Sequence, residues 1–156
     1  MTRPEPGLPR TTPLDESALL GYRNSELDML FRQAEAGPIP DGDTQGTLLA
    51  WPGTWVAAPL ARLVRVLIWQ GKVLDRREGM LRNKLTPFGL RLVKARLSVT
   101  ASWVDSADCV LIDYSKTSIL ARMVRDEIRL IGPGLYLGVV WLWRKRIGWF
   151  TIRSTR

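Results

Sequence analysis

An alternating stretch near the middle of the chain constrains the fold more than any other feature of the sequence. Between residues 93 and 103 every second residue is apolar, and the residues between them are polar or basic. Successive side chains of a strand point to opposite faces, so this period of two predicts a long antiparallel strand with one face in the core. The apolar positions are Val93, Ala95, Leu97, Val99, Ala101 and Trp103.

Further strands are predicted to be short and to follow one another closely. Apolar segments at 109–114, 124–131, 135–143 and 147–153 are separated by polar, basic or glycine-containing breaks, and residues 47–51 are another candidate. Strands joined in this way form a meander. A meander of this length commonly curls or closes, because an open sheet must protect its edges.

Two helices are predicted before the long strand. At 25–36 apolar residues recur at the spacing of one helix face, and Gly37-Pro38 ends the pattern. At 59–70 the same spacing follows Pro59, a residue suited to a first helical turn. Each apolar stripe implies that the helix docks on a larger surface.

These patterns predict a mainly β (α+β) fold with a single globular domain at 25–156. We expect a curved or closed antiparallel barrel of six to eight strands, with the two helices covering an open end or a face. A cone-shaped α+β fold of the NTF2-like type, with helices inside the curve of the sheet, is the alternative. Contact between 147–153 and 47–51 would distinguish the two. The proline-rich residues 1–24 are expected to form a mobile tail.

The composition excludes several chemistries. The chain of 156 residues has no His and a single Cys, Cys109. Catalysis by Ser-His-Asp or Cys-His sets, His-ligated zinc, multi-cysteine metal sites and an internal disulfide are therefore all excluded. The sequence identifies neither a cofactor nor an oligomeric state.

The charge is unevenly distributed, although the net charge is +8. Residues 1–58 hold four basic and eight acidic side chains, whereas residues 59–156 hold nineteen and seven. Such a surplus permits binding to nucleic acid or to an anionic membrane, but it is also common on an ordinary solvated surface. With an unpaired Cys109, no signal-peptide pattern and no apolar stretch of about 20 residues, we expect a cytoplasmic protein without a transmembrane segment.

The charged run Arg125–Arg129 lies within one predicted strand. Its alternate residues face opposite sides of the sheet, which places Asp126 with the apolar set. A buried carboxylate needs a partner, and Lys72, Arg82 or a tyrosine hydroxyl could supply one. The run is therefore either a polar anchor in a ligand cavity or a structural ion pair.

The candidate ligand-binding residues are polar groups in or beside these strands. They are Lys72, Asp113, Tyr114, Arg125, Asp126 and Tyr136. The leading hypothesis is a non-catalytic protein that binds a small, largely apolar molecule inside the barrel. The alternative is an enzyme that works without His, such as an isomerase or cyclase, with Tyr114 and Asp126 moving a proton.

Tryptophans beside a basic turn suggest a third hypothesis. The chain has seven Trp, and indoles next to cations can stack on bases or lie at a lipid interface. This would make the protein a basic module that binds nucleic acid or an anionic membrane, although the same indoles can simply pack in a core. The candidate residues are Trp143, Trp149, Arg144, Lys145 and Arg146, followed by Arg153 and Arg156.

Four segments of the chain resemble those of a group of uncharacterised bacterial proteins. That group carries W-x-G-K-x-F-D, D-Y-S, R-D-E-I-R and P-G-L-Y-L-G in this order, and the corresponding segments here are 69–75, 112–115, 125–129 and 133–138, with Leu74 in place of the aromatic residue. The resemblance spans about residues 46–152 and implies only that the motif residues share one site or one core. At the level of the fold alone, the meander is similar to the lipocalin and fatty-acid-binding class of small barrels.

Overall fold

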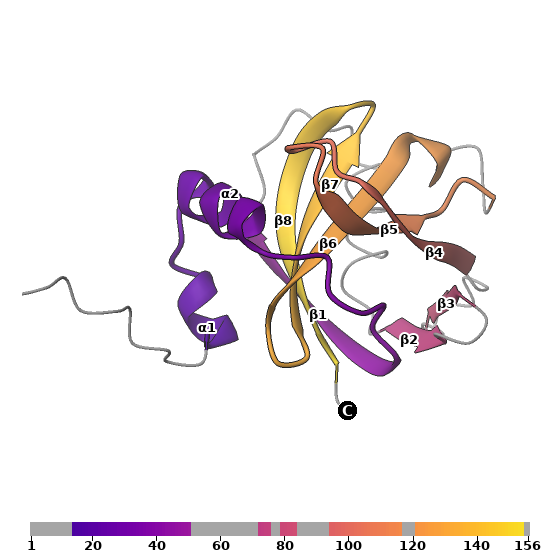
Figure 1. Cartoon of the computed structure of the whole chain (residues 1–156), viewed down its shortest axis with the longest axis horizontal. Coiled ribbons are helices and arrows are strands. Elements are labelled where there is room, and N and C mark those ends of the chain that lie inside the picture. The colour runs from indigo at the N-terminus through magenta and orange to yellow at the C-terminus, as the bar shows by residue number, and fades with distance from the viewer. Residues whose placement is uncertain (1–13, 51–71, 76–78, 84–93, 117–120, 155–156) are drawn as a thin grey trace, which may run out of the picture.

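The computed structural model describes residues 14–50, 72–75, 79–83, 94–116 and 121–154. In these residues two α-helices precede a series of antiparallel strands (Figure 1). The helices are α1 (Glu16–Leu19) and α2 (Asn24–Gln33), and a short 3-10 helix, η1 (Ala121–Met123), precedes the sixth strand. The strands are β1 (Gly42–Ala50), β2 (Lys72–Asp75), β3 (Met80–Asn83), β4 (Lys94–Ala101), β5 (Asp108–Asp113), β6 (Val124–Gly132), β7 (Leu135–Leu142) and β8 (Lys145–Ser154).

Each strand pairs with the next, and β8 pairs with β1, so the strand order closes as a barrel. The pairs Thr47 with Thr151 and Leu48 with Phe150 join the two segments whose contact distinguishes a closed sheet from a cone. The prediction of a β-rich antiparallel fold with a helix before it is confirmed. The second predicted helix, at 59–70, lies outside the described residues.

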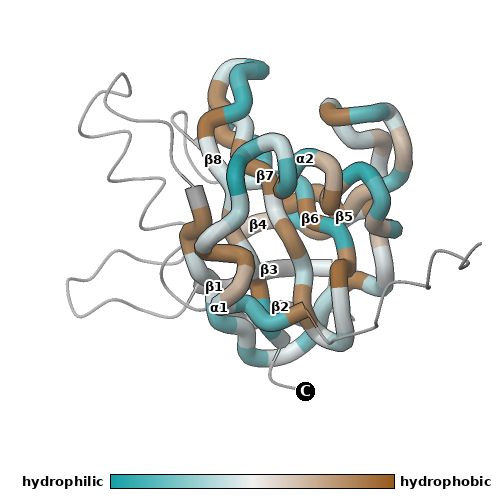
Figure 2. Tube along the Cα trace, turned by 90° about the vertical axis from the view of Figure 1, so that its left-hand side faces the viewer, coloured by the Kyte–Doolittle hydropathy of each residue, from teal (hydrophilic) through white to brown (hydrophobic). Residues whose placement is uncertain are grey.

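The described part of the barrel has two apolar layers, one inside and one outside. Along β7, Tyr136, Val140 and Leu142 belong to the inner cluster, whereas Leu137 and Val139 belong to an outer cluster under the helices. All of these residues are buried, so β7 is covered on both faces. Figure 2, viewed from the side of the helices, shows hydrophobic and hydrophilic residues alternating along the tube.

Helix α2 supplies much of the outer layer. It begins where the Glu26 carboxylate accepts a hydrogen bond from the Arg23 backbone N–H at 2.7 Å, which closes the first turn. Its apolar stripe buries Leu27 and Phe31 completely, and the Phe31 ring meets the Trp149 indole of β8 edge-on at 5.8 Å. The helix ends at Gln33, three residues before the predicted end, because Glu35 makes a β-bridge with Leu130 of β6.

Helix α1 was not predicted, because it lies in the segment expected to be a mobile tail. Its first turn is capped by the Asp15 side chain, which accepts a hydrogen bond from the Ser17 N–H. Leu19 is completely buried in the outer cluster, and Glu16 binds the side chains of Thr151 and Arg153 on β8. Residues 16–19 are therefore part of the folded unit. None of the helices in the described part of the chain has the length and apolar content to cross a membrane.

Strand β4 is only half covered, which corrects the expectation from its sequence. Ala95 and Leu97 are buried as predicted, but Val99 is 54% exposed and Ala101 is exposed as well. The pairing explains this difference, because the register with β3 ends at Arg96 and, among the described strands, the rest of β4 pairs with β5. The alternation therefore predicts a strand correctly but not how much of it enters the core.

Candidate functional site

A tyrosine and a carboxylate meet inside the barrel. Asp126 of β6 faces inward, as the period of two predicts, and its neighbour in the register is Ile112 of β5. Two residues after Ile112, the chain turns at Tyr114, and the Tyr114 hydroxyl donates a hydrogen bond to Asp126 Oδ2 at 3.1 Å. Both side chains are completely buried.

Burial raises the pKa of the Tyr114 hydroxyl well above its ordinary value, and the Asp126 charge and the hydrogen bond raise it further. Tyr114 therefore keeps its proton at neutral pH and acts as a hydrogen-bond donor. On either side of Asp126, the register places Ile112 and Val140, both completely buried. The pair is thus a polar group set among apolar side chains, suited to orienting a polar atom of a bound molecule.

Two other predicted partners of Asp126, Lys72 and Arg82, have side chains outside the described part of the structure. The remaining predicted ligand-binding residues do not join the pair. Asp113 accepts a hydrogen bond from the Ser115 N–H at 2.8 Å, and this bond stabilises the turn at the end of β5. Tyr136 faces inward at the opposite end of the barrel, where its hydroxyl donates to the Pro38 carbonyl at 2.7 Å.

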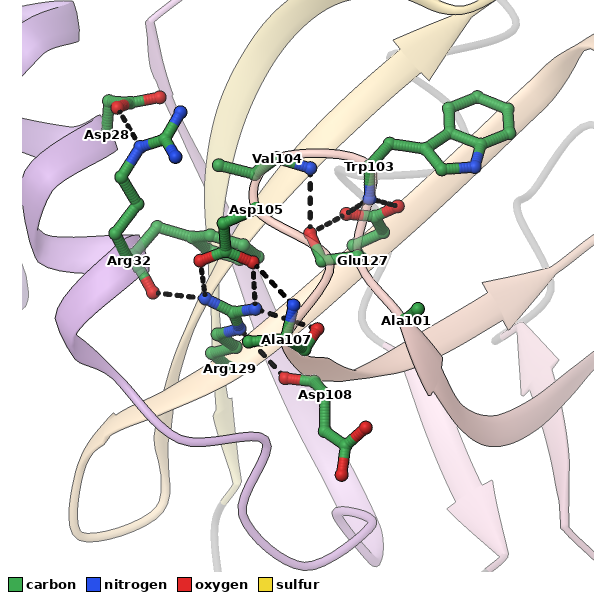
Figure 3. A network of polar contacts seen from close by, with 12 residues as sticks. Asp28, Arg32, Ala101, Trp103, Val104, Asp105, Ala107, Asp108, Glu127 and Arg129 are labelled. Atoms are coloured by element: carbon green, nitrogen blue, oxygen red, sulfur yellow. Dashed lines mark hydrogen bonds and ion pairs between the residues drawn. The ribbon is translucent and has the colours of Figure 1, made fainter.

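Arg125 lies on the outer face of β6, so it does not share the interior with Asp126. Its Nε donates to Glu127 Oε1 at 2.6 Å, and its guanidinium lies 4.4 Å from the centroid of the Trp103 ring. Glu127 is completely buried and also accepts hydrogen bonds from the Ser102 hydroxyl at 2.5 Å and the Trp103 N–H at 3.0 Å. These contacts hold the loop between β4 and β5 against the outside of β6 (Figure 3).

Arg129, the last residue of the charged run, is completely buried on the same outer face. Its guanidinium makes two hydrogen bonds with the Asp105 carboxylate, at 2.7 and 2.6 Å, and others with the carbonyls of Phe31, Ala107 and Asp108 (Figure 3). The hydrogen bonds from Arg129 hold the pKa of Asp105 below its ordinary value. Arg129 thus joins α2, the β4–β5 loop and β6.

This network was not predicted from the sequence, although a structural ion pair was one of the two interpretations of the charged run. The period of two correctly separates Asp126 from Glu127 and Arg129. It does not indicate that the loop between β4 and β5 folds back over the strand and buries both outward charges. The only available signal was the density of charges within one strand.

The predicted basic and aromatic site divides into two parts. Trp149 is 2% exposed under α2, so the prediction that its indole could stack on a base or enter a lipid interface is wrong. Arg146 lies over that indole and forms an ion pair with Asp28 of α2. Arg153 pairs with Glu16 at 3.1 Å.

The second part is the β7–β8 turn itself. Trp143 is 64% exposed, and Arg144 and Lys145 are exposed beside it. Arg156 lies outside the described residues.

No family model and no curated protein matches this chain. One solved structure does. It is the crystal structure of a protein from Thermomonospora curvata, with 16% sequence identity and a TM-score of 0.56, and the match covers 86% of this chain and 89% of that one. At this identity the likeness shows the fold alone, so the motif resemblance and the likeness to lipocalins stay predictions.

Metal chemistry has no candidate in the part of the chain that the structure describes. No three His, Cys, Asp or Glu side chains come together there in a way that could hold an ion. The free Cys109 is buried, and burial raises the pKa of its thiol to about 12, which makes it a poor nucleophile. The interior pair of Tyr114 and Asp126 is therefore the candidate functional site of the described residues.

Proposed function

We propose that the protein is a non-catalytic binding protein that holds a small, largely apolar molecule in the interior of its barrel. The observation that carries this proposal is the hydrogen bond between Tyr114 and Asp126, both completely buried. A carboxylate is costly to bury, so its place in an apolar lining favours a role in orientation, in the manner of lipocalin-like barrels.

The lining supports the apolar character of the ligand. Residues from β4, β5, β6, β7 and β8 contribute to the inner cluster, and all of them are aliphatic or aromatic. Such a lining favours apolar ligands, while one polar anchor fixes the orientation of a ligand that carries a single hydrogen-bonding group.

An enzyme that relies on the same pair is less well supported. A general base or acid works best when its pKa lies near the working pH. The pKa of Tyr114 is moved well above its ordinary value by burial, so its phenol does not exchange a proton readily at neutral pH. Binding requires no proton transfer, and Tyr114 keeps its proton in the hydrogen bond to Asp126.

Native mass spectrometry of the protein purified from its source tests the proposal. We expect an additional mass that organic solvent removes and that chromatography identifies as a small, mostly apolar compound. In vitro, the same site should bind 8-anilinonaphthalene-1-sulfonate as a fluorescent probe, and the extracted compound should displace it. Purification of the unliganded chain alone, with no displaceable probe binding, would overturn the proposal.

Variants separate the anchor from general stability. Tyr114→Phe and Asp126→Asn should each weaken binding of the extracted compound by about tenfold or more, the effect of losing a hydrogen bond to a charged group. Tyr136→Phe, which removes a hydroxyl at the other end of the barrel, and Asp113→Asn are the matched controls. Equal losses in the controls would show that the pair is not an anchor.

A further inference from the structure

The turn between β7 and β8 has an unusual backbone for its residues. Leu142 pairs with Lys145, so the loop consists of Trp143 and Arg144 alone. Both have positive φ angles, 47° and 65°. A two-residue turn of this type favours Asn-Gly, because side chains with a bulky Cβ substituent are strained there. The chain therefore keeps an indole and a cation at a position where other residues would fold more easily.

The strained turn displays its indole at one end of the barrel. Trp143 is 64% exposed, the largest exposed fraction among the large hydrophobic side chains described. Its backbone N–H donates to the Met123 carbonyl at 3.1 Å, which fixes the turn against η1. In Figure 1 the β7–β8 turn lies at the top of the barrel and the β6–β7 turn at the bottom.

Several basic side chains lie at the same end of the barrel as this indole. Arg122 precedes Met123, whose carbonyl accepts the Trp143 N–H. The Arg122 Nε donates a hydrogen bond to the Ser115 carbonyl at 3.2 Å, and Lys116 follows Ser115 in the chain. Together with Arg144 and Lys145, these are four exposed basic side chains. The described carboxylates near this end are Asp113, which accepts the Ser115 N–H, and Asp28, which pairs with Arg146. At the opposite end, β1 begins beside Asp41 and Asp43. An anionic surface would therefore attract the end that carries Trp143.

A second exposed indole near the turn, that of Trp103, already has two cations over its ring. Trp103 has the guanidinium of Arg125 at 4.4 Å and that of Arg144 at 4.6 Å from its ring centroid. A single-stranded nucleic acid is bound by several stacking platforms along a groove, whereas Trp143 is the most exposed of the tryptophans in the described part of the chain. One indole at headgroup depth with diffuse cations around it is the arrangement of an interfacial membrane anchor.

We propose that the β7–β8 turn docks the barrel, end on and reversibly, to an anionic membrane surface. Trp143 enters the headgroup region, and Arg122, Arg144 and the neighbouring lysines face the lipid phosphates and carboxylates. The proposal is independent of the ligand in the barrel, since the turn is exposed and the Tyr114–Asp126 pair is buried.

Co-sedimentation of the full chain with vesicles tests this inference. We expect binding to vesicles of phosphatidylcholine with 30% phosphatidylserine that is lost on pure phosphatidylcholine and weakened by salt, with about fivefold lower affinity for each basic residue removed. The decisive variant is Trp143→Asn with Arg144→Gly. It gives the turn the residues that its backbone favours, so the melting temperature should rise while vesicle binding falls by about tenfold or more.

The matched control is Met29→Ala with Arg32→Gln, which removes an exposed apolar side chain and an exposed cation from α2. This control should bind vesicles as the natural chain does. Equal loss of binding in both double variants, or equal binding to neutral and anionic vesicles, would overturn the proposal. Tighter binding to a single-stranded oligonucleotide than to anionic vesicles at the same salt concentration would overturn it as well.

Discussion

Arg129 is the side chain whose replacement most sharply tests the account of the outer network. Its guanidinium is completely buried and takes part in five hydrogen bonds, two with Asp105 and three with backbone carbonyls. The substitution Arg129→Met keeps an unbranched apolar stem but has no guanidinium and donates no hydrogen bond. It therefore removes the connection between α2, the β4–β5 loop and β6 without creating a large cavity.

The expected loss of folding free energy depends on the polar groups that bind Arg129 in the natural chain. Breaking a buried ion pair costs about 3–5 kcal/mol, since the remaining partner stays partly desolvated. Asp105 is 16% exposed and can turn toward water, and the Phe31 carbonyl still accepts the Ala34 N–H at 3.2 Å, so we expect the free energy of unfolding to fall by about 3 kcal/mol, the low end of this range. Arg129→Lys keeps the charge but cannot span the Asp105 carboxylate, and it should lose about 2 kcal/mol.

Guanidinium chloride unfolding followed by circular dichroism measures both values. Because Arg129 holds the pKa of Asp105 below its ordinary value of 3.8, this contribution is present above that pH and is lost as the pH falls through the lowered pKa. The difference in the free energy of unfolding between the natural chain and Arg129→Met should therefore become smaller at acidic pH. Arg32→Met, on an exposed arginine of α2, is the control. A loss below about 1 kcal/mol for Arg129→Met, or one no larger than the control, would refute the reasoning.

Three further predictions concern single buried groups. Gly138→Ala should destabilise the protein by about 1–3 kcal/mol, because the new Cβ would lie 2.2 Å from the Phe150 ring. Gly132→Ala is the control, because its new Cβ would lie 4.0 Å from Leu135 Cβ, an ordinary contact, and thermal unfolding compares the two. Cys109, with its pKa raised to about 12 by burial, should resist iodoacetamide at pH 8 until denaturant is added, so labelling of the native chain would contradict the structure. In an alkaline absorbance titration, Tyr114→Phe should leave the tyrosinate signal of the folded protein unchanged, since burial keeps that phenol protonated.

Periodicity predicted the strands that are long enough to show it. The boundaries expected for β6 and β7 differ from the structure by one residue, since each strand has an apolar face and ends at a turn. Strands β2 and β3 have four residues each, too few to establish a period of two. Helix α1 is equally short, and its capping residue Asp15 lies close to prolines that favour a tail.

The sequence predicts that the Asp126 side chain faces the core, but it does not identify the residue that binds it. Alternation alone turns Asp126 inward, and a tyrosine hydroxyl was among the expected partners. Choosing Tyr114 requires the register that sets Ile112 beside Asp126, and register depends on pairing between strands. The burial of Arg129 depends on a helix almost 100 residues earlier in the chain, which no local pattern encodes.

The ion pairs of the N-terminal helices also set the order in which the molecule can assemble. Glu16 reaches Arg153 over 137 residues, and Asp28 reaches Arg146 over 118. At ordinary rates of synthesis, a nascent chain would wait on the order of ten seconds between making α2 and making β8. During that interval Leu27 and Phe31 have no docking face, so the helices are exposed to chaperones first and join the barrel last.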